Sequence, residues 1–84
     1  MNIRVRLFAR ARDLAGRDML HLELMPGATI GDARHRLAAA CPELATILPR
    51  CALAVNDEFA DDAVRIATNA EIACLPPVSG GGAK

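Results

Sequence analysis

The chain has 84 residues, of which 52% are hydrophobic, and its ten basic and ten acidic side chains give a formal net charge of zero. This length predicts one domain with a modest core, and the balanced charge argues against a nucleic-acid partner. The sequence contains neither an apolar run long enough for a transmembrane helix nor the apolar segment of a signal peptide, so we expect a cytoplasmic protein that does not bind membranes.

The first 24 residues predict two strands. Residues 2–8 alternate between apolar and charged side chains, as do residues 18–24, and such alternation is typical of strands with one buried face. Residues 9–17 between them are too many for a tight turn, and they predict one helical turn. We expect the two strands to form a hairpin in which an arginine of the first strand lies opposite Glu23.

A helix is predicted from Ile30 to about Ala40. Thr29 is a good N-cap, and Asp32 stands three residues later, where a capping box has its acidic residue. Pro42 ends this helix and begins a short second helical turn. The apolar side chains that we expect on one face are Ile30, Ala33, Leu37, Ala38 and Cys41.

The second half of the chain predicts short strands separated by turns. Residues 51–55 and 71–75 are the stronger candidates, and residues 64–67 predict a short bridging strand. Phe59 is apolar among four carboxylates, and we expect its side chain to turn back into the core. One helix of about three turns can cover only one face of a sheet, so the pattern predicts an α+β fold with a mixed four- to five-stranded sheet.

Neither the cysteines nor the histidines indicate a metal site or a permanently bound cofactor. The three cysteines, Cys41, Cys51 and Cys74, have no CxxC spacing, and we expect them to be reduced residues in or near the core. His21 and His35 do not stand at ligand spacing from any cysteine.

The last nine residues predict a flexible tail, so we divide the chain into a domain of residues 1–75 and a tail of residues 76–84. Proline removes a backbone donor and glycine lacks a Cβ, so this segment can leave the sheet and pass through a gap too narrow for other residues. Such a tail suits delivery of a C-terminus to another protein, although a frayed terminus is an equally common explanation. The tail residues are Pro76, Pro77, Val78, Ser79, Gly80, Gly81, Gly82, Ala83 and Lys84.

Three signatures together resemble those of the small subunits of molybdopterin synthase, which are ubiquitin-like β-grasp sulfur carriers. The first is Leu7-Phe8-Ala9-Arg10-Ala11-Arg12-Asp13-Leu14-Ala15-Gly16, the second is Ala54-Val55-Asn56, and the third joins Glu71-Ile72-Ala73 to Pro76-Pro77-Val78-Ser79-Gly80-Gly81. The resemblance covers residues 1–81. It implies a β-grasp fold with one main helix on one face of the sheet.

The resemblance also implies a function. An adenylating enzyme of the ubiquitin-activating type would use ATP and Mg²⁺ to activate the carboxylate of Gly81, and a sulfur donor protein would convert it to a thiocarboxylate. Residues 76–80 would then insert into the large subunit of molybdopterin synthase, where the sulfur is transferred to cyclic pyranopterin monophosphate. Phe8, Arg10, Arg12 and Leu75 are the residues that we expect to contact partners.

Two departures from the family pattern stand out. Thr68-Asn69-Ala70 replaces the usual turn before the last strand, and Gly82-Ala83-Lys84 follows the glycine at which the family normally ends. We expect a protease to remove residues 82–84, although a cloning remnant or an altered function would also explain them. The alternative functions are a thiamine-type sulfur carrier, a ubiquitin-like protein modifier, and a non-catalytic β-grasp binding module with a blocked tail.

Overall fold

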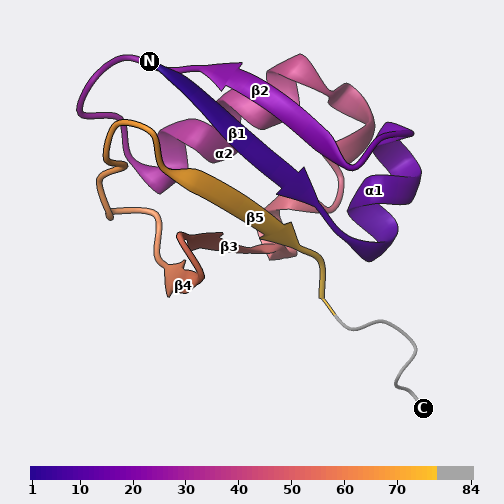
Figure 1. Ribbon diagram of the computed structural model, residues 1–84. Helices are drawn as coiled ribbons and strands as arrows, with labels where there is room; N and C mark the ends of the chain where they lie inside the picture. The colour runs from indigo at the N-terminus through magenta and orange to yellow at the C-terminus, as the bar shows by residue number, and fades with distance from the viewer. Residues whose placement is uncertain (78–84) are drawn as a thin grey trace.

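The computed structural model describes residues 1–77, which form one mixed sheet with helices on one side (Figure 1). The sheet contains five strands in the order β2-β1-β5-β3-β4. Strands β1 and β5 are parallel, and the other neighbouring pairs are antiparallel. The elements are β1 (Asn2–Leu7), α1 (Ala9–Ala15), β2 (Met19–Glu23), α2 (Ile30–Ala40), the 3₁₀ helices η1 (Pro42–Leu44) and η2 (Leu48–Arg50), β3 (Ala52–Val55), β4 (Glu58–Ala60) and β5 (Glu71–Leu75).

This architecture confirms the predicted α+β class and the ubiquitin-like β-grasp arrangement. The last strand, β5, lies in the middle of the sheet between β1 and β3. The helix α2 crosses behind the sheet, and α1 lies beyond the carboxyl end of β1, on the side where β5 ends (Figure 1). Because β5 is hydrogen-bonded on both edges, the segment that follows it leaves from a fixed position.

The first two strands form the predicted hairpin, but the expected charge pairing across it is wrong. Glu23 lies opposite Asn2, and its carboxylate is 3.1 Å from the amino group of Met1. Arg4 and Arg6 instead approach Glu71, on the other neighbouring strand, at 3.8 and 3.2 Å. The sequence could not show this ion pairing, because the second neighbour of β1 in the sheet is β5, which comes from the other end of the chain.

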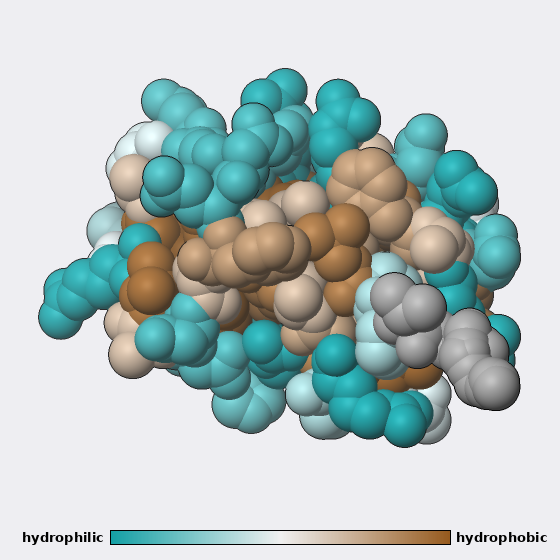
Figure 2. All heavy atoms as spheres, turned by 90° about the horizontal axis from the view of Figure 1, so that it is seen from below, coloured by the Kyte–Doolittle hydropathy of each residue, from teal (hydrophilic) through white to brown (hydrophobic). Residues whose placement is uncertain are grey.

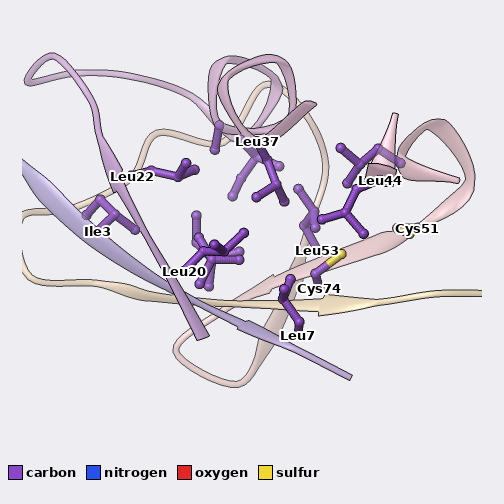
Figure 3. Close-up of a cluster of buried hydrophobic side chains, with 14 of the residues drawn as sticks. Ile3, Leu7, Leu20, Leu22, Leu37, Leu44, Cys51, Leu53 and Cys74 are labelled. Atoms are coloured by element: carbon purple, nitrogen blue, oxygen red, sulfur yellow. The ribbon is translucent and has the colours of Figure 1, made fainter. Parts of the chain in front are cut away.

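The predicted capping box of α2 is present. The Thr29 hydroxyl accepts a hydrogen bond from the Asp32 backbone N–H, and the Asp32 carboxylate accepts one from the Thr29 N–H at 2.9 Å. The apolar stripe faces the sheet, with Ala38 half-buried and its other members buried. Side chains from both ends of the chain meet this stripe, among them Ile3, Leu7, Leu53 and Cys74 (Figure 3).

All three cysteines are free and buried in this core, as expected. Cys74 has no exposed surface, and it lies opposite Leu53 in the β3–β5 pair. Burial raises the pKa of the Cys74 thiol to about 12, with the nearby Cys51 as a secondary cause. The sulfur atoms therefore serve the core as apolar groups, because a thiol of this pKa stays protonated at neutral pH.

The segment between β3 and β5 differs most from the prediction. Residues 64–67 form only one isolated bridge, between Thr29 and Arg65, whereas residues 58–60 form the unpredicted strand β4. Phe59 lies in this strand with 75% of its surface exposed, so its expected position in the core is wrong. It pairs with Ala54, whose side chain is on the face of the sheet away from α2, and the strand alternation places Phe59 on that face too.

Candidate functional site

The carboxyl end of β5 is the position from which the predicted tail departs. Leu75 is half-buried and lies opposite Ala52, and the next residues change from half-buried Pro76 to exposed Pro77. The residues predicted to enter a partner or to carry the chemistry, Val78, Ser79, Gly80 and Gly81, lie outside the described residues, as do residues 82–84. Their roles remain predictions, but the structure fixes where they must begin.

Apolar side chains gather on the face of the sheet opposite α2. We define the outer patch as Phe8, Ala52, Phe59, Ala73 and Leu75. The strand register places these residues in two adjoining rows. Phe59 and Ala73 lie in one row, with the buried Ala54 of β3 between them, and Ala52 and Leu75 belong to the next row. Seen from the side of β3 and β4, an apolar band crosses the middle of the molecule between hydrophilic side chains (Figure 2).

Phe8 completes the second row of the outer patch. Its backbone N–H donates to the carbonyl of Cys74 at 3.3 Å, so it continues the parallel pairing of β1 with β5 and comes beside Leu75. Its backbone is extended at the N-cap of α1, and 40% of its surface is exposed. Two exposed phenylalanines on the same face of one small sheet are typical of a protein-binding surface.

Basic residues border this surface on the side of β1 and α1. Arg4 and Arg6 lie on the outer face and share the carboxylate of Glu71. Arg10 and Arg12 lie on α1, are exposed, and form no ion pair with any residue of the described chain. The four predicted contact residues within the domain therefore belong to one end of the molecule, around the exit of β5.

Sequence reasoning missed Phe59 as a member of this surface. Residues 58–60 alone carry no clear signal of its position, because the exposure of Phe59 follows from its pairing with Ala54 across β3 and β4. The four carboxylates around it are typical of a hydrated turn, so the three-residue strand was not predicted. Phe59 belongs to the outer patch because its side chain is exposed and because it pairs with Ala54 on the face away from α2.

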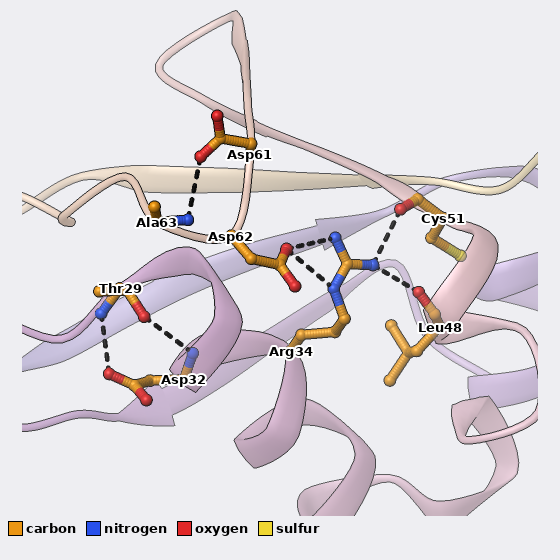
Figure 4. Close-up of polar contacts among 8 residues, drawn as sticks. All are labelled: Thr29, Asp32, Arg34, Leu48, Cys51, Asp61, Asp62 and Ala63. Atoms are coloured by element: carbon orange, nitrogen blue, oxygen red, sulfur yellow. Dashed lines mark hydrogen bonds and ion pairs between the residues drawn. The ribbon is translucent and has the colours of Figure 1, made fainter.

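Arg34 is a second residue that the pattern did not reveal. Its guanidinium donates to the carbonyl oxygens of Leu48 and Cys51 and to the carboxylate of Asp62 (Figure 4). Leu48 and Cys51 lie in the segment that leads into β3, and Asp62 follows β4. Arg34 therefore fastens α2 to the segments that carry Ala52 and Phe59, and it positions the outer patch from behind the sheet.

The described part of the chain offers binding surface but little catalytic chemistry. The Cys41, Cys51 and Cys74 thiols have their pKa raised by burial, which opposes a nucleophilic or sulfur-relay role for any of them. Within residues 1–77, no three His, Cys, Asp or Glu side chains come together as metal ligands. No helix in this range is long and apolar enough to cross a membrane.

Known proteins resemble this chain over almost its whole length. The ThiS family model matches residues 5–81. The molybdopterin synthase sulfur carrier subunit of Arabidopsis thaliana is 36% identical over 81 residues, which cover 96% of this chain and 84% of that protein. The protein of the same name from Chlamydomonas reinhardtii is 35% identical over 96% of this chain and 100% of its own length.

One solved structure has the same fold as this chain and is also similar to it in sequence. It is the crystal structure of SAMP1, a small archaeal modifier protein, from Haloferax volcanii. The TM-score is 0.86 at 29% identity, and the alignment covers 96% of this chain and 100% of that one. The likeness therefore extends to proteins named as carriers and to a protein named as a modifier.

Proposed function

The chain belongs to the ThiS family, and from this premise we propose that it is the sulfur carrier subunit of a molybdopterin synthase. The observation that carries the proposal is the match of 36% identity, over 96% of the chain, to a protein of that name. The matched family region ends at Gly81, the glycine whose carboxyl group the proposal uses. The position of β5 supports it, because a strand paired on both sides gives the tail a rigid base.

The proposed chemistry takes place at the Gly81 carboxylate after residues 82–84 have been removed. A carboxylate oxygen attacks the α-phosphorus of ATP on an adenylating enzyme that uses Mg²⁺, and pyrophosphate leaves. The terminal sulfur of a donor persulfide then attacks the acyl carbon, and AMP leaves. Cleavage of the resulting acyl disulfide by a thiol yields the thiocarboxylate and a disulfide. ATP and Mg²⁺ belong to the partner enzyme in this scheme, and the chain itself retains no cofactor.

The domain contributes position rather than catalysis. From Leu75 to Gly81 the chain can extend by about 20 Å, at about 3.3 Å per residue, which is enough to reach into a partner while the sheet stays outside. The outer patch would bind the large subunit of the synthase beside the entry point of the tail. Pro76 and Pro77 reduce the conformational entropy that the tail loses on insertion. The substrate in the large subunit would be cyclic pyranopterin monophosphate.

A ubiquitin-like modifier is the second candidate, and the likeness to SAMP1 is the observation that favours it. In that function the activated Gly81 would be attacked by a lysine amine of another protein, giving an isopeptide bond. Activation of the carboxylate is common to both candidates, and only the nucleophile differs. A binding module without activation remains the outcome if the extension is kept.

Intact-mass measurement of the protein from its native host tests the proposal. We expect a species that ends at Gly81, with a fraction heavier by the replacement of one oxygen with sulfur. A ladder of conjugates to other proteins, without the thiocarboxylate, would favour the modifier. A chain that keeps residues 82–84 and lacks the thiocarboxylate while the pathway is active would overturn the carrier function.

A further inference from the structure

We propose that the free chain binds a second copy of itself through the outer patch, by a two-fold rotation about an axis parallel to the strands. The inference concerns the chain on its own and does not depend on the sulfur-carrier function. It goes beyond that function because it gives the outer patch a partner before any large subunit is present. The strand order and the position of each charge on this face favour a second copy.

The apolar centre of the face has one strand on each side of it. Strands β5 and β3 lie in the middle, β1 lies on one side and β4 on the other, and α2 crosses behind the sheet (Figure 1). In the middle, Leu75 lies opposite Ala52. Phe8 follows β1, and Phe59 stands in β4, so each side offers one exposed phenylalanine. A rotation that exchanges β5 with β3 therefore also places β1 of one copy against β4 of the other.

The charges on the two sides have opposite sign. Arg4 and Arg6 of β1 share the single carboxylate of Glu71, so the side of β1 keeps an excess of positive charge. Asp57 stands in the turn before β4 and Asp61 directly follows that strand. Neither aspartate forms an ion pair with another residue in the range 1–77. A partner of one charge would be repelled by one side of the face, whereas a rotated copy is attracted at both.

The register sets a cationic side chain and an aromatic one at the same height on the two sides. Arg6 of β1 lies opposite Ala73, Ala73 lies opposite Ala54, and Ala54 lies opposite Phe59 of β4. The rotation keeps the height along the strands, so the guanidinium of Arg6 meets the Phe59 ring of the other copy. A guanidinium over an aromatic ring is a favourable contact, and the two-fold axis forms it twice.

The next row sets opposite charges at the same height. Arg4 lies opposite Glu71, and the Glu71 carbonyl accepts a hydrogen bond from the Asn56 backbone N–H at 2.9 Å. Asp57 follows Asn56 in the chain and is exposed. The same rotation therefore brings Asp57 of one copy to Arg4 of the other, again twice.

The contact fits the usual packing of two sheets. Sheets that pack face to face with their strands roughly aligned are a common arrangement in proteins, and the proposed axis produces it. Because the outer patch is small, the dimer is weak and dissociates on dilution. Where the proposed function holds, the large subunit would have to displace the second copy, because both use the outer patch.

Sedimentation velocity of the full chain tests the proposal. We expect the average mass to rise toward that of a dimer between about 10 μM and about 1 mM, a range suited to a weak interface. Phe59→Ala should weaken the dimer at least about tenfold, since both copies lose an aromatic contact. Val64→Ala is the control, because Val64 is bonded to the start of α2, and it should leave the dimer unchanged.

Charge reversal tests the orientation of the two copies. Arg4→Glu and Asp57→Lys should each weaken the dimer about tenfold, because like charges would meet at both contacts. An equimolar mixture of these two variants should recover the unmodified affinity to within about twofold, because opposite charges meet again in the mixed dimer. Arg36→Glu, an exposed change on α2, is the matched control and should have no effect. Dispersed amide NMR spectra establish that each variant is folded.

Three outcomes would overturn the proposal. A chain that stays monomeric up to about 1 mM would leave the outer patch to other partners, since even weak specific interfaces associate at such concentrations. A dimer that Phe59→Ala does not weaken would lie on another surface. A mixture no tighter than either variant would exclude the proposed rotation. None of these results alters the intact mass of the native protein, so the carrier function is tested separately.

Discussion

Arg34 of α2 and Asp62, which follows β4, form an ion pair in which the guanidinium Nη2 lies 2.9 Å from the carboxylate Oδ1. The same guanidinium donates to the backbone carbonyls of Leu48 and Cys51. One side chain thus joins the helix to the entry of β3 and to the loop after β4. The Leu48 carbonyl also accepts from the backbone N–H of Cys51 at 3.1 Å, so Arg34 is one of its two donors.

Replacement of this arginine should lower stability. We expect Arg34→Met to reduce the free energy of unfolding by about 1–3 kcal/mol, because the carbonyls of Leu48 and Cys51 each lose a donor and Asp62 loses its charged partner. Urea denaturation measures the change. The same substitution at exposed Arg36 is the control and should cost less than about 0.5 kcal/mol. Equal losses at the two positions would show that the contacts of Arg34 add nothing to stability.

Phe59 should matter for binding and not for folding. Under the proposed function, Phe59→Ala should weaken the complex with the large subunit of molybdopterin synthase by about 2 kcal/mol, since an exposed aromatic side chain of the outer patch would lose its contact. Isothermal titration calorimetry measures this affinity. Val64→Ala removes an exposed apolar side chain outside the strands and should have no effect on binding. A large loss of stability in Phe59→Ala would instead mean that the ring packs within the domain.

Asn56 should stabilise the turn into β4 in two separable ways. Its backbone has a positive φ of 48°, and its side-chain oxygen accepts a hydrogen bond from the Glu71 N–H at 3.1 Å. Asn56→Gly keeps the conformation but removes the hydrogen bond, and we expect a loss of about 1 kcal/mol. Asn56→Ala also strains the backbone and should cost about 1 kcal/mol more. Thermal unfolding of both variants gives the order, and an alanine variant as stable as the glycine variant would contradict this account.

The buried thiols should make stability fall in alkaline solution. The pKa of Cys74 is raised to about 12 by burial, whereas in the unfolded chain it should be about 8.5. Above the unfolded value the unfolded state releases a proton that the native state keeps, so stability decreases as pH rises, by up to about 1.4 kcal/mol per pH unit for this group. The chain has no tyrosine, and the Cys41 and Cys51 thiols, whose pKa burial also raises, contribute to the slope in the same direction.

Urea denaturation from about pH 8 to about pH 10 measures that slope, because this range begins near the ordinary thiol pKa. Cys74→Ala should reduce the slope, whatever its effect on absolute stability. The exposed change Arg17→Ala should leave it unaltered. A slope that is the same in Cys74→Ala and in the unmodified protein would show that the thiol does not carry the effect.

Local patterns explain why much of the fold could be predicted. Alternation identified β1 and β2, and the capping box placed the start of α2 at Ile30 as the structure has it. These signals lie within a few residues of the chain and depend on backbone geometry alone. The predicted position of Phe59 failed because its orientation depends on a pairing with Ala54 that three consecutive residues could not disclose.

The sequence by itself determined the class of fold, the apolar stripe of α2 and the core positions of the cysteines, because each depends on residue type and short spacing. Tertiary structure alone decided which charges pair and which apolar side chains share a surface. Glu71 meets Arg4 and Arg6, and Phe8 comes beside Leu75, because the parallel pairing of the first and last strands brings the two ends of the chain together. Such contacts between distant segments follow from strand order, which leaves no trace in local composition.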